Sequence, residues 1–199
     1  MVRDLTKDVK SSFLSVEKDI KTILYKLFVE NPYREDLLRL MVINNKDCID
    51  DRDNPQYKEI LKSMTTSKLR ELGYIKLEPK LNFEEFPDVK SHLVISFDNY
   101  VPNTTNPEFR DNTISFDIIC HTDYWDIGDF RLRPFKIMGY IDGILNKSKL
   151  SGIGTLQFIG CQQLIINQEI SGYTLTYLAI HDGDDENPKT PEEMAADNG

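Results

Sequence analysis

The sequence predicts an α+β protein: an antiparallel sheet packed by one helix, in the order β-β-α-β-β, with an N-terminal helical subdomain. Apolar residues recur at helical spacing up to about residue 72, and they alternate with polar residues along four later segments. A further segment with helical spacing lies between the second and third of those strands. Helices followed by strands in this order are typical of the α+β class.

Three helices are expected before the sheet. The first, Ser12–Glu30, has one broad apolar stripe, and a shorter helix follows over Arg34–Val42. A third extends over Gln56–Leu72, where Gly73 is well placed to end it. The polar stretch Met64–Ser67 leaves open a division of this third helix into two.

The strands are expected after Gly73. They are Tyr74–Leu77, His92–Tyr100, Thr113–His121, Thr155–Ile166 and Tyr173–His181. We expect the second and third of these to pair as an antiparallel hairpin around the long loop Val101–Asp111. Ser171-Gly172 is a turn signal and indicates a turn just before the last strand.

The helix of the core is expected over Pro134–Asn146, because a proline is tolerated at the first helical position. One stripe of this helix is expected to face inward, and it consists of Phe135, Met138, Ile141 and Leu145. Gly139 and Gly143 share another face, which suits close approach of a sheet.

Charge divides the chain into three predicted parts. Residues 1–80, the helical subdomain, carry a net charge of +2, and residues 81–181, the sheet core, carry −5. Residues 182–199 form an acidic flexible tail of −6, which brings the whole chain to −9. An acidic chain without a basic run is a poor candidate for general binding to nucleic-acid phosphates.

The compartment is predicted from apolar segments and cysteines. No segment is apolar over the roughly 20 residues that a membrane-spanning helix needs, and the N-terminus lacks the apolar stretch of a signal peptide. We expect Cys48, Cys120 and Cys161 to be reduced thiols, the last two packed inside strands, although a disulfide between those two stays open. The sequence predicts a protein of the reducing cytosol with no membrane partner.

Catalytic patterns are weak. Cys120, His121 and Asp123 offer a nucleophile, a base and a carboxylate, but adjacent strand residues point to opposite faces, so thiol and imidazole do not meet. Gly152-x-Gly154 lacks the third glycine of a dinucleotide loop and precedes a strand. Three histidines in separate segments give no metal-ligand spacing. We expect no enzyme activity, no cofactor and no metal.

A winged-helix DNA-binding regulator with an α+β sensor domain is the alternative hypothesis. The segment Gln56–Leu72 would then be its recognition helix, but the basic groups of this helix are only Lys62, Lys68 and Arg70. The segment Lys80–Val89, which would form the wing, carries three acidic side chains that repel phosphate.

Two loops carry candidate protein-interface residues. Tyr, Trp and Arg dominate the energy of many interfaces, and the loop Thr122–Leu132 with the residue after it contains Tyr124, Trp125, Phe130, Arg131 and Arg133. The loop Val101–Asp111 adds Asn106, Phe109 and Arg110, because long ordered loops are often functional. The alternative is that Trp125 and Phe130 tuck beneath their loop. Open sheet edges, which a ring assembly can close, are also expected.

The last hundred residues resemble the phage tail terminator (tail completion) family of neck proteins. The resemblance covers residues 90–181 and is one of pattern and element order. Its motifs are Ile114-x-Phe116-Asp117-Ile118, Arg133-Pro134, Ile141-Asp142-x-x-Leu145, Leu150-x-Gly152-x-Gly154-x-Leu156-x-Phe158, Asn167 and Gly172-Tyr173-x-Leu175-x-Tyr177.

The resemblance implies a structural protein of the virion neck, made in the host cytoplasm. Its copies would form a ring, a hexamer in this family, that caps the tail tube and joins it to the head-side connector. The partners implied are other copies of the chain, the tube protein and the connector, with DNA passing through the ring without specific binding. Acidic charge suits that passage, because it keeps DNA from adhering to a channel wall.

Overall fold

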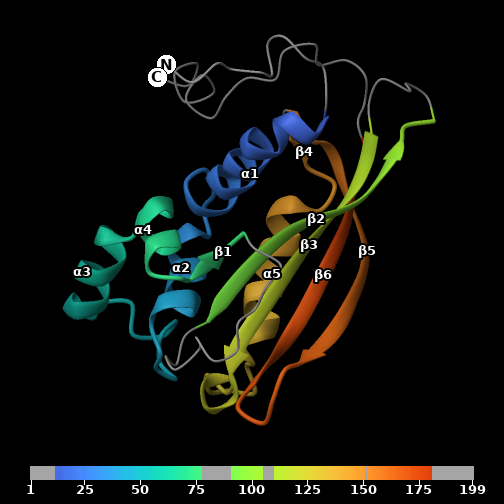
Figure 1. Cartoon of the computed structure of the whole chain (residues 1–199). Helices are drawn as coiled ribbons and strands as arrows, with labels where there is room; N and C mark the ends of the chain where they lie inside the picture. Colours follow the sequence, from blue (N-terminus) through green and yellow to red (C-terminus); the bar gives the residue numbers. More distant parts are fainter. Residues whose placement is uncertain (1–11, 78–90, 105–109, 151, 181–199) are drawn as a thin grey trace.

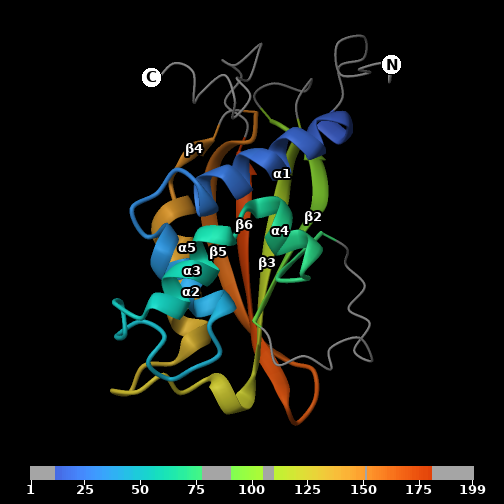
Figure 2. The ribbon, with the colours of Figure 1, turned by 90° about the vertical axis from the view of Figure 1, so that its left-hand side faces the viewer.

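The structure, a computed structural model, describes residues 12–77, 91–104, 110–150 and 152–180. Within these residues the helices lie on one side of a single six-stranded sheet (Figure 1). The view from the helical side (Figure 2) shows the same layers, with the helices in front of the strands. The predicted α+β class is confirmed.

The sheet has the strand order β1-β2-β3-β6-β5-β4. Its four long strands pair antiparallel, as predicted, whereas the short β1 adds parallel to β2. The helix α5 (Arg133–Leu145) connects β3 to the second half of the sheet, so the β-β-α-β-β order is also confirmed. The strands are β1 Ile75–Lys76, β2 His92–Pro102, β3 Arg110–His121, β4 Lys149–Leu150, β5 Gly154–Ile165 and β6 Ile170–Ile180.

The remaining helices pack onto the same core as the sheet. They are α1 Ser12–Phe28, α2 Arg34–Val42, α3 Pro55–Ser63 and α4 Thr66–Glu71. Leu27 of α1, Leu38 of α2 and Phe116 of β3 are fully buried in one continuous apolar core. The boundary between residues 1–80 and 81–181 stays a prediction, and residues 182–199 lie outside the described residues.

The helical pattern over Gln56–Leu72 corresponds to two helices, as the polar interruption had left open. Asn54 caps α3, since its side chain accepts hydrogen bonds from the amides of Gln56 and Tyr57. Thr65 has an extended backbone and its hydroxyl accepts from the amide of Lys68, so it caps α4 and separates it from α3.

The predicted turn at Ser171-Gly172 is wrong, because both residues lie within β6. The turn precedes them, and the side chain of Asn167 holds it by accepting hydrogen bonds from the amides of Glu169 and Ile170, both at 2.8 Å. Gly172 is required for a different reason. A Cβ atom there would overlap the backbone carbonyl of Ile118 on β3, so only glycine permits this approach of the strands.

The hairpin of β2 and β3 is longer than predicted. β2 continues to Pro102 and β3 begins at Arg110, with a register shift between Asp98 and Val101. The bulge places Asn99 at φ +51°, a left-handed conformation that asparagine tolerates better than most residues. Only the two ends of the predicted loop Val101–Asp111 are therefore strand, and its residues 105–109 lie outside the described residues.

The inward stripe of α5 differs from the prediction at one position. Met138, Ile141 and Leu145 are buried as expected, but Phe135 is 48% exposed and Ile137 is buried instead. Gly139 and Gly143 are exposed, and a Cβ atom on either would meet no neighbour within 4 Å, so they do not admit the sheet.

The three cysteines are free thiols, which confirms that they form no disulfide. Cys48 and Cys120 are buried, but Cys161, predicted to pack inside a strand, is exposed because β5 lies near the edge of the sheet. None of the helices among the described residues is long and apolar enough to cross a membrane.

Candidate protein interface

The loop that follows β3 ends in a small hairpin. It starts with a single 3-10 turn, Thr122–Tyr124, in which the His121 side chain accepts a hydrogen bond from the amide of Asp123. Asp126 and Leu132 then form an isolated antiparallel bridge. Inside this bridge the amide of Ile127 donates to the carbonyl of Arg131, and the amide of Arg131 donates to the carbonyl of Gly128. The backbone of the loop is therefore fixed by its own hydrogen bonds.

The tip of the hairpin is Gly128-Asp129-Phe130, and all three residues have positive φ angles, of 80°, 49° and 59°. A left-handed conformation costs a residue with a side chain roughly 1–2 kcal/mol. Asp126 offsets part of this cost, because its side chain accepts a 2.9 Å hydrogen bond from the amide of Gly128. The tip thus holds two non-glycine residues in an unfavourable conformation.

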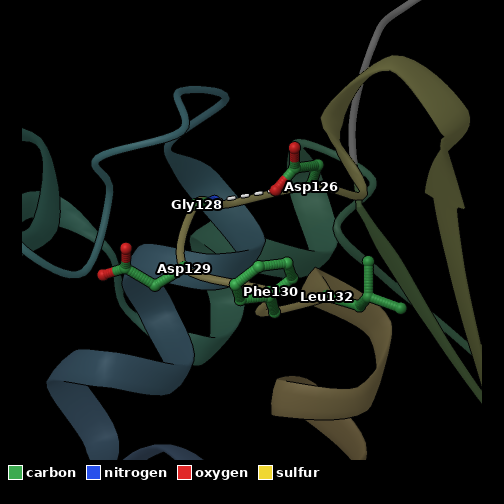
Figure 3. A pocket seen from close by; sticks show the side chains of 5 residues that line it. All are labelled: Asp126, Gly128, Asp129, Phe130 and Leu132. Carbon is green, nitrogen blue, oxygen red and sulfur yellow. Dashed lines mark hydrogen bonds between the residues drawn. The ribbon is translucent and has the colours of Figure 1, made fainter.

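Phe130 is fully exposed at this tip. Figure 3 shows its ring beside Leu132, with Asp126 and Asp129 on the flanks of the same surface hollow. Because the ring of Phe130 stays in water, it contributes no burial free energy to the fold, while its backbone conformation costs free energy. Such a side chain is suited to burial in the pocket of a binding partner.

Arg131 connects the hairpin to the loop between α2 and α3 through an ion pair. Its guanidinium donates to both carboxylate oxygens of Asp50, which lies in the loop between α2 and α3, and also to the carbonyls of Gly128 and Ile127. The hydrogen bond from Arg131 lowers the pKa of the Asp50 carboxyl below its usual value of 3.8. Arg131 therefore supports the tip, and its charge is largely engaged within the chain.

Arg133 is a correction to the sequence prediction, because it is fully buried and so is not part of an exposed interface. Its guanidinium donates to the carbonyls of Tyr124, Leu40, Ile43 and Asn45. Three of these carbonyls belong to the end of α2 and the residues after it, where a helix leaves carbonyls without partners. Arg133 thus joins the loop, α2 and α5 from the inside.

Trp125 is neither fully exposed, like Phe130, nor fully buried, like Arg133. It is half-buried, its indole N–H lies 3.4 Å from the carbonyl of Cys120, and its ring lies 6.1 Å from that of Tyr173. The ring of Phe135 lies 4.8 Å from that of Tyr173. The tucked alternative is therefore confirmed for Trp125 and wrong for Phe130. Tyr124, also half-buried, contacts the ring of His121 edge-on.

The second predicted loop is not brought near the first. Arg110 is half-buried at the start of β3, whereas Phe130 follows the end of that strand. Twelve strand residues separate the two ends by roughly 36 Å. Asn106 and Phe109 lie outside the described residues.

Sequence reasoning missed Leu132 as part of this surface, the exposure of Phe135 and the role of Asp50. Leu132 is 38% and Phe135 48% exposed, and Asp50 holds the loop from a distant part of the chain. The turn signal Gly128-Asp129 marks the tip, but no local pattern shows that Asp50 pairs with Arg131. Phe130, with Leu132 beside it, forms the aromatic tip of the hairpin.

The catalytic and DNA-binding hypotheses gain no support from the geometry. Burial raises the pKa of the Cys120 thiol to about 11, which keeps it protonated and unreactive at neutral pH. No group of three or more His, Cys, Asp or Glu side chains among the described residues is arranged to hold a metal. The six-residue α4 is about 9 Å long, short for a helix that reads a groove of DNA.

The fold and the aromatic tip define an α+β protein with a hydrogen-bonded surface hairpin that presents an exposed phenylalanine. The sequence matches the YomW family over residues 34–179, so the chain belongs to this phage-associated family. A comparison with curated proteins gives no match.

Proposed function

We propose that the protein is a structural component of the virion neck, of the tail-terminator kind. Its copies assemble into a ring that caps the tail tube and joins it to the head-side connector. The observation that carries this proposal is the aromatic tip, since a strained and fully exposed phenylalanine on a fastened hairpin is best explained by burial in a partner. Membership of a phage-associated family and the resemblance of residues 90–181 to tail terminators support it.

The proposed role needs no chemistry. We expect the ring to be a hexamer that ends polymerisation of the tube. Its channel would let DNA pass without specific binding. The chain's net charge of −9 suits such passage, because an acidic wall repels the phosphates of DNA. The protein would be made in the host cytoplasm and reside in the virion.

The proposal is tested by mixing the full chain with tail-tube protein from the same phage-associated locus. Electron microscopy should show rings seated on tube ends, and tubes grown with the chain present should be shorter. Phe130→Ala should reduce end-capping at least tenfold, as expected for loss of a dominant interface residue. Capping by Phe130→Ala at the unchanged level, or tight binding of duplex DNA by the wild-type chain, would contradict the proposal.

A further inference from the structure

We propose that the outer edge of β5 pairs with the same edge of a second copy of the chain, across a two-fold axis, so that two sheets become one. This pairing is separate from the proposed neck function and does not depend on it. β5 is the outermost long strand on the right-hand side of the sheet in Figure 1. β4 pairs only with Gly154 and Thr155, and beyond Phe158 no described residue pairs with this edge.

The backbone of β5 presents hydrogen-bonding groups along this edge. The amide of Ile166 donates to the carbonyl of Ile170, in the direction of β6, and the register with β6 is regular from Gly160 to Ile165. Successive amides of a strand point alternately to its two sides, so those of Cys161 and Gln163 point away from β6. An antiparallel partner strand needs outward amides and carbonyls at every second residue, which is the arrangement here.

β5 lacks the features that protect a free edge. Its sequence, GTLQFIGCQQLI, contains no charged residue and no proline, although 29% of the whole chain is charged. Phe158, Ile159 and Ile165 are 38%, 52% and 70% exposed. Charged residues, prolines and a covering segment are the usual protection of an edge strand, and among the described residues none of these closes this edge to another strand.

The opposite edge of the sheet, formed by β1 and β2, is protected. This favours pairing of the β5 edge with the β5 edge of a second copy. β1 covers the start of β2, and β2 further on has the exposed Asp98, a bulge and a terminal proline, Pro102. A head-to-tail contact would need both edges, whereas a two-fold contact uses the β5 edge twice. The uncharged strand also meets its copy without repulsion, despite a net charge of −9 on each chain.

The first test is the mass of the full chain by light scattering over a range of concentrations. For the chain alone, without tube protein, we expect a species of twice the 23.1 kDa chain mass. Gln163→Pro removes an outward amide without removing a bond to β6, so it should weaken the dimer by roughly tenfold or more. Gln163→Glu should weaken it too, by placing like charges across the axis. Gln157→Glu is the matched control, since it adds the same charge to an exposed position beside β4 and should leave the dimer unchanged.

Cys161 gives an independent readout, because it is exposed whereas Cys48 and Cys120 are buried. A short bismaleimide should join two wild-type copies, but not two copies of Cys161→Ser or Gln163→Pro. Circular dichroism confirms that each variant is folded. A monomer at all concentrations, or a dimer that the Gln163 variants leave unchanged, overturns the inference. A six-fold ring that they leave unchanged also overturns it while supporting the proposed function.

Discussion

Arg131 and Asp50, which lie 81 positions apart in the sequence, form a two-point ion pair that joins the hairpin of Phe130 to the loop between α2 and α3. A guanidinium that meets both oxygens of a carboxylate is fixed in orientation as well as in distance. The conformation of the aromatic tip therefore depends on a residue far away in the chain.

Asp50→Asn should loosen the hairpin without unfolding the protein, because Asp50 is exposed and contributes little to the core. We expect faster amide exchange at residues 126–132, measured by hydrogen–deuterium exchange, and weaker binding of the tube protein. The Asp50 carboxyl has a lowered pKa in the folded state, so the ion pair is present above the ordinary value of 3.8 and is lost as the pH falls below it. In the wild type, the protection of these amides relative to their intrinsic exchange rates should fall over that same range.

Asp53→Asn is the matched control for this experiment. Asp53 also has a lowered pKa, through its 2.8 Å ion pair with Lys58, but that pair does not contact the hairpin. We expect no change in exchange at residues 126–132. Equal exchange in wild type and Asp50→Asn would show that the internal hydrogen bonds of the hairpin suffice to hold it.

Phe130→Gly should separate stability from binding. Glycine adopts positive φ without cost, so the change should stabilise the fold by about 1 kcal/mol, measured by thermal denaturation. Binding of the partner should fall, because the exposed ring is lost. Asp129→Gly relieves strain in the same way but keeps the ring, so it should raise stability and leave binding intact. A fall in stability for Phe130→Gly would mean that the ring packs within the fold.

The local pattern of apolar and polar residues was sufficient to predict the helices and strands of this fold, but not which side chains the hairpin exposes. Alternation in β2, β3, β5 and β6 and the proline at the start of α5 predict the order of the core, because strand and helix periods are local properties. Burial of Trp125 and exposure of Phe130, two aromatic residues in one loop, are not local. They depend on the contact of Trp125 with Tyr173 and on positive φ angles at the tip.

The dependence on contacts between distant segments also explains why the predictions for Arg133 and Gly172 were wrong. An arginine next to an aromatic loop is typical of an interface, but its partners are carbonyls about 90 positions earlier in the chain. A Ser-Gly pair is typical of a turn, yet Gly172 faces a carbonyl of β3. Each outcome depends on which segments become neighbours, and that is decided by the packing of the whole chain.

Arg133→Met should destabilise the protein strongly. The side chain is fully buried, and its loss leaves the carbonyls of Leu40, Ile43 and Asn45 without this donor. Unsatisfied buried acceptors cost about 1–3 kcal/mol each, so we expect a loss of about 3 kcal/mol or more in urea unfolding. Arg133→Lys keeps the charge but reaches fewer carbonyls and should lose less. The exposed Lys58→Met should have no measurable effect, and an equally small change for Arg133→Met would contradict this role.

Gly172→Ala and Gly139→Ala should change stability in opposite directions. A Cβ atom at Gly172 would overlap the backbone of Ile118, which cannot move without disturbing the pairing of β3 and β6, so we expect a loss of about 2 kcal/mol or more in urea unfolding. Gly139 lies on the exposed side of α5 with no neighbour within 4 Å of a Cβ, so alanine should add about 1 kcal/mol through its helix propensity. Because both substitutions add the same methyl group, the difference between them measures the space at each site. A Gly172→Ala protein as stable as the wild type would mean that the backbones of β3 and β6 leave room for a Cβ atom at this position.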